Sequence, residues 1–286
     1  MSQRLRLAIQ SSGRLSDDTT DLLKACGIRI SRPDRKLRMV SEHFDIEILF
    51  VRDDDIPGYV ADGVADAGVV GENVVLEKNP DVRQLDRLGF AACRLSIALP
   101  KTDTYNSLED LNGKHIATSY PGLLGRYFEK NGIKASIHEI SGSVEIAPGI
   151  GLADGICDIV SSGSTLISNG LKEVEVILRS EAVLIASPEL SEEKQAILDT
   201  LQFRIQSVLK AKKHRYILMN VPNESIERVK DILPGMRAPT VMPLVQEGWS
   251  SVHSVIPDRA FWDVIDNLKE AGAEGMLVIP IEKMVL

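Results

Sequence analysis

The residues best suited to chemistry lie in one segment, from Glu145 to Leu166. This segment passes through an apolar stretch ending near Val160 and then enters the small, hydroxyl-rich turn Ser161-Ser162-Gly163-Ser164-Thr165. A strand that ends in such a turn just before a helix directs backbone N–H groups and hydroxyls at one point. Gly163 allows the backbone to approach an anion closely. The pattern predicts a cradle for a phosphate monoester, and an ordinary loop is the alternative interpretation.

The charges around this turn limit how it would bind phosphate. Residues 141–170 contain no Lys or Arg, and their acids are Glu145, Asp154 and Asp158. The predicted cradle would therefore bind phosphate through dipoles and hydroxyl groups. The acids before the turn could face sugar hydroxyls or a Mg²⁺ ion, which prefers oxygen ligands.

Other nucleotide and metal motifs fail on spacing. Gly149-Ile150-Gly151 lacks the third glycine of a dinucleotide fingerprint at the required position, and Gly113-Lys114 lacks the flanking residues of a P-loop. The five histidines are isolated, so a zinc site is not expected. Asp53-Asp54-Asp55 could bind a metal, but the start of a solvated helix is the simpler interpretation.

The elements that position these residues alternate between strands and helices. Strands are expected at Leu5–Ile9, 46–51 and 67–71, with helices near 17–26 and 54–62. This alternation is typical of an α/β domain with a mostly parallel sheet.

A second α/β lobe is expected from about Pro100. Its strands are predicted at 115–118, 136–140 and 156–161, and its main helix at 121–131. The apolar run Ala182–Ala186 should return the chain to the first sheet. A lobe inserted into another leaves a cleft between them, where ligands usually bind.

The rest of the chain predicts a long helix over 191–213 and then a separate small unit. Its strands and helices are expected at 216–221, 224–233, 240–244, 251–256, 258–271 and 275–279. The order βαββαβ is ferredoxin-like. Such a module on a metabolic enzyme is a plausible regulatory or assembly unit.

Composition excludes several classes of protein. Lys plus Arg is 33 and Asp plus Glu is 41, so the net charge is −8, which argues against a nucleic-acid partner. The three cysteines are scattered and predict reduced thiols. No secretory signal or membrane-spanning run is apparent, so we expect a cytoplasmic protein without a membrane partner.

The segment from Glu145 to Leu166 closely resembles the phosphoribosyl-diphosphate motif of the ATP phosphoribosyltransferase family, the committed enzymes of histidine biosynthesis. Further matches follow in order: 8–15, 51–57, 68–73, 93–95, 116–121 and 280–284. The C-terminal unit is similar to the regulatory domain of the family's long form.

The resemblance implies a periplasmic-binding-protein-like, two-lobed catalytic body with a C-terminal ferredoxin-like (ACT-like) regulatory domain. The expected boundaries are 1–97 with 180–213 for lobe I, 98–179 for lobe II and 214–286 for the regulatory domain.

The resemblance also implies a reaction, in which N1 of ATP attacks C1 of phosphoribosyl diphosphate, with Mg²⁺ required and pyrophosphate released. We assign no general base. Phosphoribosyl diphosphate would contact Glu145, Asp154, Ser161, Ser162, Gly163, Ser164 and Thr165. ATP and AMP would contact Arg14, Arg52, Gly71, Arg94 and Tyr120, although the arginines could equally form surface ion pairs.

The metal ligands are left open: the substrate would hold most of the Mg²⁺ coordination, with Asp154 as a candidate. Many relatives carry a lysine where this chain has Ser11, so a lysine contact to phosphate is not expected from that turn.

The resemblance further implies inhibition by histidine and by AMP, and a homo-oligomer between a dimer and a hexamer. Asn220 and Thr240 are candidates for the histidine pocket, with strand or turn capping as the alternative. Two other functions stay open at this point. One is a non-enzymatic two-lobed protein that binds a small ligand, and the other is a prephenate dehydratase-like enzyme with a regulatory domain.

Overall fold

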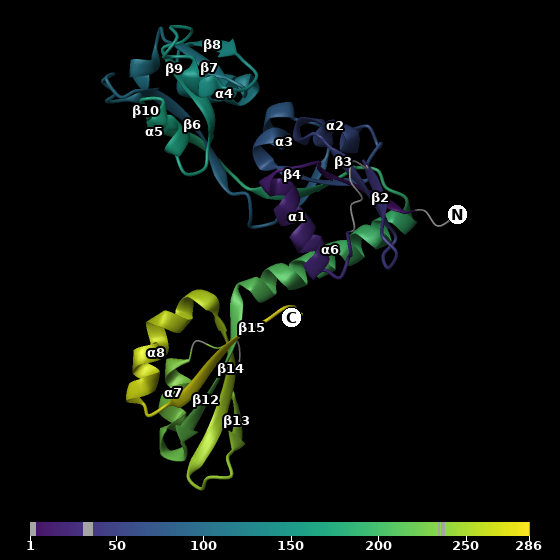
Figure 1. The fold of residues 1–286 in the computed structure, drawn as a ribbon, viewed down its shortest axis with the longest axis vertical. Helices are drawn as coiled ribbons and strands as arrows, with labels where there is room; N and C mark the ends of the chain where they lie inside the picture. The colour runs from purple at the N-terminus through teal and green to yellow at the C-terminus, as the bar shows by residue number, and fades with distance from the viewer. Residues whose placement is uncertain (1–3, 31–36, 234, 236–237, 286) are drawn as a thin grey trace. The chain divides into compact units, whose positions relative to one another are not determined.

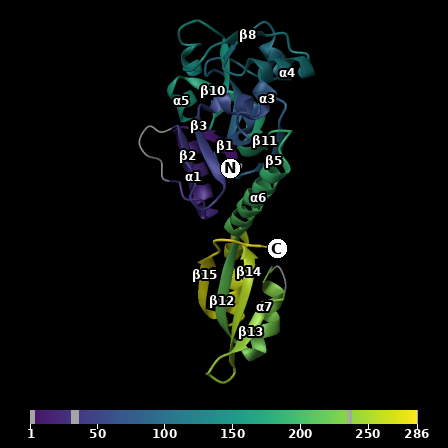
Figure 2. The ribbon, with the colours of Figure 1, turned by 90° about the vertical axis from the view of Figure 1, so that its right-hand side faces the viewer.

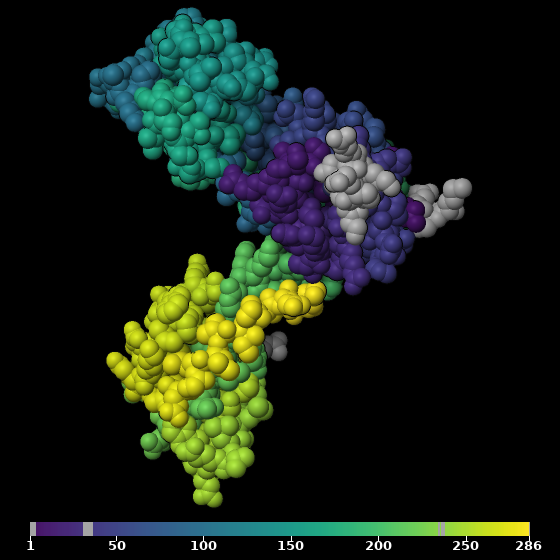
Figure 3. All heavy atoms as spheres, in the orientation of Figure 1, coloured from purple at the N-terminus to yellow at the C-terminus, as the bar shows by residue number. Residues whose placement is uncertain are grey.

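The computed structural model describes residues 4–30, 37–233, 235 and 238–285. The chain divides into two compact units, one made of Met1–Lys24 with Ile28–Leu198 and the other of Ala25–Gly27 with Asp199–Leu286. The first unit contains two α/β lobes, drawn in purple to blue and in teal to green in Figure 1. Figure 3 shows the teal atoms of the second lobe packed into one body that adjoins blue atoms of the first.

The first lobe is built on a six-stranded sheet with the order β2-β3-β1-β4-β11-β5. Its strands are β1 (Leu5–Gln10), β2 (Arg38–Val40), β3 (Ile46–Val51), β4 (Ala67–Gly71), β5 (Arg83–Arg87) and β11 (Ala182–Ala186). β1 pairs in parallel with β3 and β4, and β11 pairs antiparallel with β4. The expected return of 182–186 to the first sheet is confirmed, and every residue of β11 is buried.

The helices of this lobe follow the strands at their carboxyl ends. They are α1 (Arg14–Ala25), the 3₁₀ turn η1 (Asp53–Asp55), α2 (Ile56–Ala61) and α3 (Glu72–Lys78). Because β1 lies between β3 and β4, the connections that leave β1 and β4 run to opposite sides, and ligands commonly bind at such a switch point. Helix α1 begins earlier than expected, because Gly13 turns the chain with a φ of +95° and its carbonyl accepts the N–H of Asp17.

The second lobe has a five-stranded sheet with the order β10-β6-β9-β7-β8. Its elements are β6 (Cys93–Pro100), η2 (Leu108–Leu111), β7 (His115–Thr118), α4 (Pro121–Asn131), β8 (Ser136–Glu139), η3 (Val144–Ile146), β9 (Gly155–Val160), α5 (Ser164–Ser168) and β10 (Leu171–Ser180). Strands β7, β8 and β9 are parallel, so their carboxyl ends share one edge of the sheet. Residues 93–97, assigned to the first lobe from sequence, pair within this sheet.

Four strands, β2, β5, β6 and β10, were not predicted from the sequence, and two of them, β5 and β10, have a common reason. Both lie at the edge of a sheet and contain several charged residues, Arg83-Gln84-Leu85-Asp86-Arg87 in β5 and Lys172, Glu173, Glu175 and Arg179 in β10. Charged side chains are common on edge strands because one side of the strand faces solvent. The apolar alternation that identifies a half-buried strand is therefore weak in both.

The second unit contains most of α6 (Glu192–Lys212), whose first residues belong to the first unit, followed by a βαββαβ module. The module's elements are β12 (His214–Pro222), η4 (Asn223–Ser225), α7 (Ile226–Ile232), β13 (Thr240–Pro243), β14 (Trp249–Pro257), η5 (Asp258–Ala260), α8 (Phe261–Glu270) and β15 (Glu274–Pro280). The sheet order β13-β14-β12-β15 is antiparallel throughout, as in ferredoxin-like folds.

One face of this small sheet forms the core of the module. Ile217, Met219 and Val252 point to the side where Val229 of α7 and Leu268 of α8 pack. Figure 2 shows the four strands and α7 of this unit turned by a quarter turn from Figure 1. The expected fold class, two α/β lobes followed by a ferredoxin-like domain, is confirmed.

Two smaller features complete the description. Within the described ranges, no helix is both long and apolar enough to cross a membrane. The three cysteines, Cys26, Cys93 and Cys157, are free thiols, as expected.

Candidate active site

The hydroxyl-rich turn lies at the carboxyl end of β9 and leads into the single-turn helix α5. Gly163 adopts a φ of +82°, a left-handed conformation that favours glycine. The hydroxyl groups of Ser162 and Ser164 are 3.0 Å apart, and Ser161 and Thr165 are exposed. Backbone geometry and side chains therefore expose several hydroxyl groups around one point, as an anion cradle requires.

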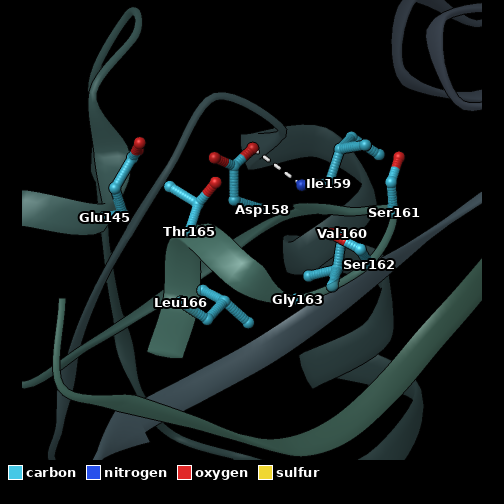
Figure 4. Close-up of a pocket in the computed structure, with 9 residues that line it drawn as sticks. All are labelled: Glu145, Asp158, Ile159, Val160, Ser161, Ser162, Gly163, Thr165 and Leu166. Atoms are coloured by element: carbon cyan, nitrogen blue, oxygen red, sulfur yellow. Dashed lines mark hydrogen bonds between the residues drawn. The ribbon is translucent and has the colours of Figure 1, made fainter. Parts of the chain in front are cut away.

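A pocket of about 210 Å³ opens at this turn. Figure 4 shows its lining residues: Glu145, Asp158, Ile159, Val160, Ser161, Ser162, Gly163, Thr165 and Leu166. In that view the carboxylates of Glu145 and Asp158 lie on either side of the Thr165 side chain, and Ser161 lies at the opposite end. The pocket thus combines a hydroxyl-rich end with an acidic end.

Asp158 is the acid closest to the turn along the chain. Its carboxylate accepts the N–H of Ile159 at 2.7 Å. Burial raises the pKa of Asp158, and the negative charge of Glu145 raises it further. Two neighbouring acids with oxygen acceptors suit the paired hydroxyls of a ribose.

The structure does not bring Asp154 to this pocket. Asp154 precedes β9, so it lies at the opposite end of the strand from the turn, about 20 Å away at roughly 3.3 Å per residue. Its carboxylate accepts the N–H of His115 at 2.7 Å and lines a different pocket. Asp158 occupies the position beside the cradle that the sequence analysis gave to Asp154. The position of Asp158 near the carboxyl end of a predicted strand was the sequence signal that could have identified it.

Arg14 reaches the cradle from the first lobe. It is the first residue of α1, which follows β1, and its Nη2 donates to Ser161 Oγ at 3.0 Å. Arg94, on β6, donates from Nη1 to the Ser161 carbonyl at 3.0 Å. Two guanidinium groups therefore meet the same serine, and they supply positive charge that residues 141–170 lack.

Arg94 is not free to neutralise a ligand fully. Its Nε and Nη2 each donate to the Glu173 carboxylate at 2.6 Å, which raises the pKa of Arg94 and lowers that of Glu173. Such a bidentate pair fixes the guanidinium in place. Arg94 thus supports the backbone of the cradle, and Arg14 is the better placed of the two to meet a phosphate.

Gly71 of the first lobe and Tyr120 of the second are linked through Asn73. A side chain at Gly71, the last residue of β4, would place its Cβ 2.5 Å from Asn73 Oδ1. Asn73 Nδ2 in turn donates to the Tyr120 hydroxyl at 3.0 Å. Burial raises the pKa of Tyr120, so the phenol stays neutral and its own proton can be donated to a ligand. Asn73 was not predicted, because it acts through a contact between lobes.

The loop after β3 supplies one basic and several acidic groups. Arg52 is exposed, and among the described residues its guanidinium has no hydrogen bond or ion pair, while its carbonyl accepts the N–H of Asp55 at 3.1 Å. Asp53 follows it, and its buried Oδ1 has no hydrogen-bond partner among those residues. Burial and the adjacent Asp54 raise the pKa of Asp53 to about 6. Across residues 4–30, 37–233, 235 and 238–285, no three His, Cys, Asp or Glu residues are grouped so that they could hold a metal.

Asn220 and Thr240, the candidates for regulation, belong to the second unit. Asn220 pairs with Ser251 of β14 and Thr240 pairs with His253, so all four side chains share the sheet face away from the helices. The His253 ring lies 2.7 Å from the Tyr216 hydroxyl and 2.9 Å from that of Ser251. This face therefore offers a small polar cluster centred on His253.

Comparisons with known proteins agree over the whole chain. The family model described as ATP phosphoribosyltransferase matches residues 52–207, and the model described as HisG, C-terminal domain matches residues 211–283. The ATP phosphoribosyltransferase of Cytophaga hutchinsonii is 61% identical over 285 residues, which cover 100% of both chains. That of Bacteroides thetaiotaomicron is 54% identical over 99% of this chain and 100% of its own.

A solved structure supports the same family over most of the chain. A chain from the ATP phosphoribosyl transferase (HisG:HisZ) complex of Thermotoga maritima superposes with a TM-score of 0.62 at 32% identity. The match covers 98% of that chain but 72% of this one. Together with the separate match of the C-terminal model, these similarities show that the chain belongs to the ATP phosphoribosyltransferase family, in the long form that carries a C-terminal domain.

Proposed function

We propose that the pocket at the end of β9 binds phosphoribosyl diphosphate, whose phosphoribosyl group this chain transfers to N1 of ATP. Family membership makes the chain a transferase of the first step of histidine biosynthesis. The observation that supports the placement of the substrate is the turn at Ser161–Thr165, contacted by Arg14 and Arg94 beside two acids.

In this arrangement the 5-phosphate accepts hydrogen bonds from the turn at Ser161–Thr165 and from Arg14. The ribose hydroxyls donate to Glu145 and Asp158. When N1 of adenine bonds to C1, the bond from C1 to the diphosphate oxygen breaks, and positive charge develops on the sugar. The nearby carboxylates stabilise that charge, and the reaction otherwise needs positioning more than a protein nucleophile.

ATP enters from the first lobe, at the switch point between the ends of β1 and β4. Arg14 and Arg52 supply charge for its phosphates, and Gly71 leaves room for the approach of the nucleotide. The hydroxyl of Tyr120 donates a hydrogen bond from the other lobe. AMP, which shares these features, competes for the same position.

Magnesium accompanies the diphosphate. Mg²⁺ prefers carboxylate, phosphate and water oxygens, and Glu145 and Asp158 are the acids on the pocket wall that suit it. The substrate oxygens would supply most of the coordination, with these two carboxylates as the protein's contribution. When bound, the ion neutralises the diphosphate as a leaving group.

Regulation is assigned to the second unit. We propose that histidine binds on the open sheet face near Asn220 and Thr240 and inhibits the enzyme, and that the chain works in the cytoplasm as a homo-oligomer between a dimer and a hexamer. The proposed domains are 1–97 with 180–213, 98–179 and 214–286, adjusted so that residues 93–97 and Ser180 belong to the second lobe with β6 and β10.

The test uses the full-length protein with ATP, phosphoribosyl diphosphate and Mg²⁺. Formation of phosphoribosyl-ATP, with an equal amount of pyrophosphate, is the expected result, and added histidine should reduce the rate. Tight binding of either substrate without turnover would instead support a non-enzymatic two-lobed binding protein, and turnover of prephenate would support the dehydratase-like alternative.

A further inference from the structure

Helices α3 and α4 belong to different lobes and lie side by side in both ribbon views (Figure 1 and Figure 2). Glu77 of α3 reaches the beginning of α4: its Oε1 accepts the N–H of Gly122 and its Oε2 accepts the N–H of Leu123, both at 2.7 Å. The first N–H groups of a helix have no partner within it and carry partial positive charge. A carboxylate from the first lobe thus caps a helix of the second.

The sequence of α4 fits this contact. Pro121 occupies the first helical position, where a missing N–H costs nothing. A Cβ at Gly122 would lie 2.9 Å from Glu77 Oε1, so glycine permits the close approach of the carboxylate. One turn later, Arg126 donates to the carbonyl of Leu76, near the end of α3. Each helix therefore supplies a charged side chain to the backbone of the other.

Asn73 adds a second contact to the same segment from one turn earlier on α3. It donates to the Tyr120 hydroxyl, and its own amide is fixed by Ser180, whose hydroxyl donates to Asn73 Oδ1 at 2.9 Å and accepts the Asn73 N–H at 3.0 Å. Ser180 ends β10, just before the chain returns to the first lobe at β11. The amide orientation of Asn73 is therefore set by this hydrogen-bond network.

Glu77 and Tyr120 also line a pocket of about 310 Å³ whose walls come from both lobes. Its other walls include Asp54 and Val74 from the first lobe and Ser119 and Glu139 from the second. The carboxyl ends of β7, β8 and β9 share one edge, so this pocket and the cradle open on the same side of the second lobe's sheet. The separation of the lobes sets the width of this space.

We propose that Asn73 and Glu77, here called the α3 clasp, are positioning residues that set the closure of the two lobes and hold Tyr120 in the nucleotide site. This inference rests on the proposed function. The cradle lies wholly in the second lobe except for Arg14, so loosening the clasp should leave binding of phosphoribosyl diphosphate almost intact. The reaction itself needs ATP and the sugar brought together across the lobes, so turnover should suffer.

The kinetic test compares Glu77→Ala and Glu77→Gln in the full-length protein. The alanine variant should lower kcat by about tenfold or more and raise the KM for ATP, because a misplaced partner is costly to a bimolecular reaction. The Kd for phosphoribosyl diphosphate alone, by calorimetry, should stay within about twofold. Glu77→Gln keeps one acceptor oxygen and should recover part of kcat. Glu129→Gln, an exposed acid later on α4, is the control and should match the wild type.

A second measurement is independent of turnover. Hydrogen–deuterium exchange at the Gly122 and Leu123 amides of the substrate-free protein should accelerate in Glu77→Ala and not in Glu129→Gln. Faster exchange with an unchanged kcat would overturn the positioning role. A loss of affinity for phosphoribosyl diphosphate as large as the loss for ATP would overturn it as well. If Glu77→Ala does not fold, Asn73→Ala replaces it under the kinetic and calorimetric criteria, since Asn73 contacts the Tyr120 hydroxyl and not these amides. If the wild type itself forms no phosphoribosyl-ATP, the proposed function fails, whereas unchanged exchange in Glu77→Ala refutes the clasp alone.

Discussion

Replacing Asp53 with asparagine should stabilise the folded chain at neutral pH. The carboxyl of Asp53 has a buried oxygen without a hydrogen-bond partner among the described residues, and burial together with Asp54 raises its pKa from 3.8 to about 6. A difference of about two units corresponds to roughly 3 kcal/mol at 1.36 kcal/mol per unit. Because the residue is partly exposed, we expect roughly 1–3 kcal/mol.

The sign of the pH dependence follows from the raised pKa of Asp53. Well below pH 4 the carboxyl is protonated in both the folded and the unfolded chain, so it costs the folded state nothing. As the pH rises from about 4 to about 6, the unfolded chain loses the proton more readily, and the free energy of unfolding falls. Above pH 6 the full penalty is present, and asparagine removes it.

Thermal melting measures this effect. At pH 7.5 the Tm of Asp53→Asn should exceed that of the wild type by a few degrees, and the difference should shrink as the pH approaches 4. Asp55→Asn, a change at an exposed neighbour, serves as the control. Equal Tm values at pH 7.5, or a difference that persists unchanged at pH 4, would refute the reasoning.

Three further predictions concern the two ligand sites. Asp158→Asn should lower kcat far more than Asp154→Asn, because only Asp158 lines the pocket at the turn. Steady-state kinetics measures both variants, and an equal loss of kcat in the two would contradict this placement. Thr165→Ala should raise the KM for phosphoribosyl diphosphate about tenfold, because one hydrogen bond to a charged group is lost, and should change the KM for ATP little. Thr104→Ala is the control and should leave both KM values unaltered. Equal increases of both KM values in Thr165→Ala would argue against a phosphate contact. Thr240→Val should raise the histidine concentration for half inhibition about tenfold, and an unchanged inhibition curve would remove Thr240 from the regulatory site.

The local parts of the site were predictable from sequence. The turn at Ser161–Thr165 needs only a strand before it, a glycine that adopts positive φ and a helix after it, and these are properties of neighbouring residues. The apolar run 182–186 was equally clear, because a fully buried strand must consist of apolar residues.

The choice between Asp154 and Asp158 was predictable but was made wrongly. Asp154 precedes the strand and Asp158 lies near its carboxyl end, so the spacing along the strand alone favours Asp158 as the acid beside the turn. Glu145 is different, because its place on the pocket wall comes from how η3 packs beside β9 and not from its distance along the chain.

Contacts between the lobes were missed altogether. Asn73 and Glu77 belong to a short helix of the first lobe, and their partners lie near residue 120 in the second. The hydrophobic pattern of α3 contains no information about a helix from another lobe. Such residues become visible only when the closure of the lobes is known.

The most direct test of the account is the position of the new glycosidic bond. ATP labelled with ¹⁵N at N1 of adenine, incubated with phosphoribosyl diphosphate, Mg²⁺ and the full-length protein, should give a product whose anomeric ribose proton couples to that nitrogen in the NMR spectrum. Asp158→Asn should form this product much more slowly. A product without that coupling, or no product at all from the wild-type chain, would contradict transfer to N1.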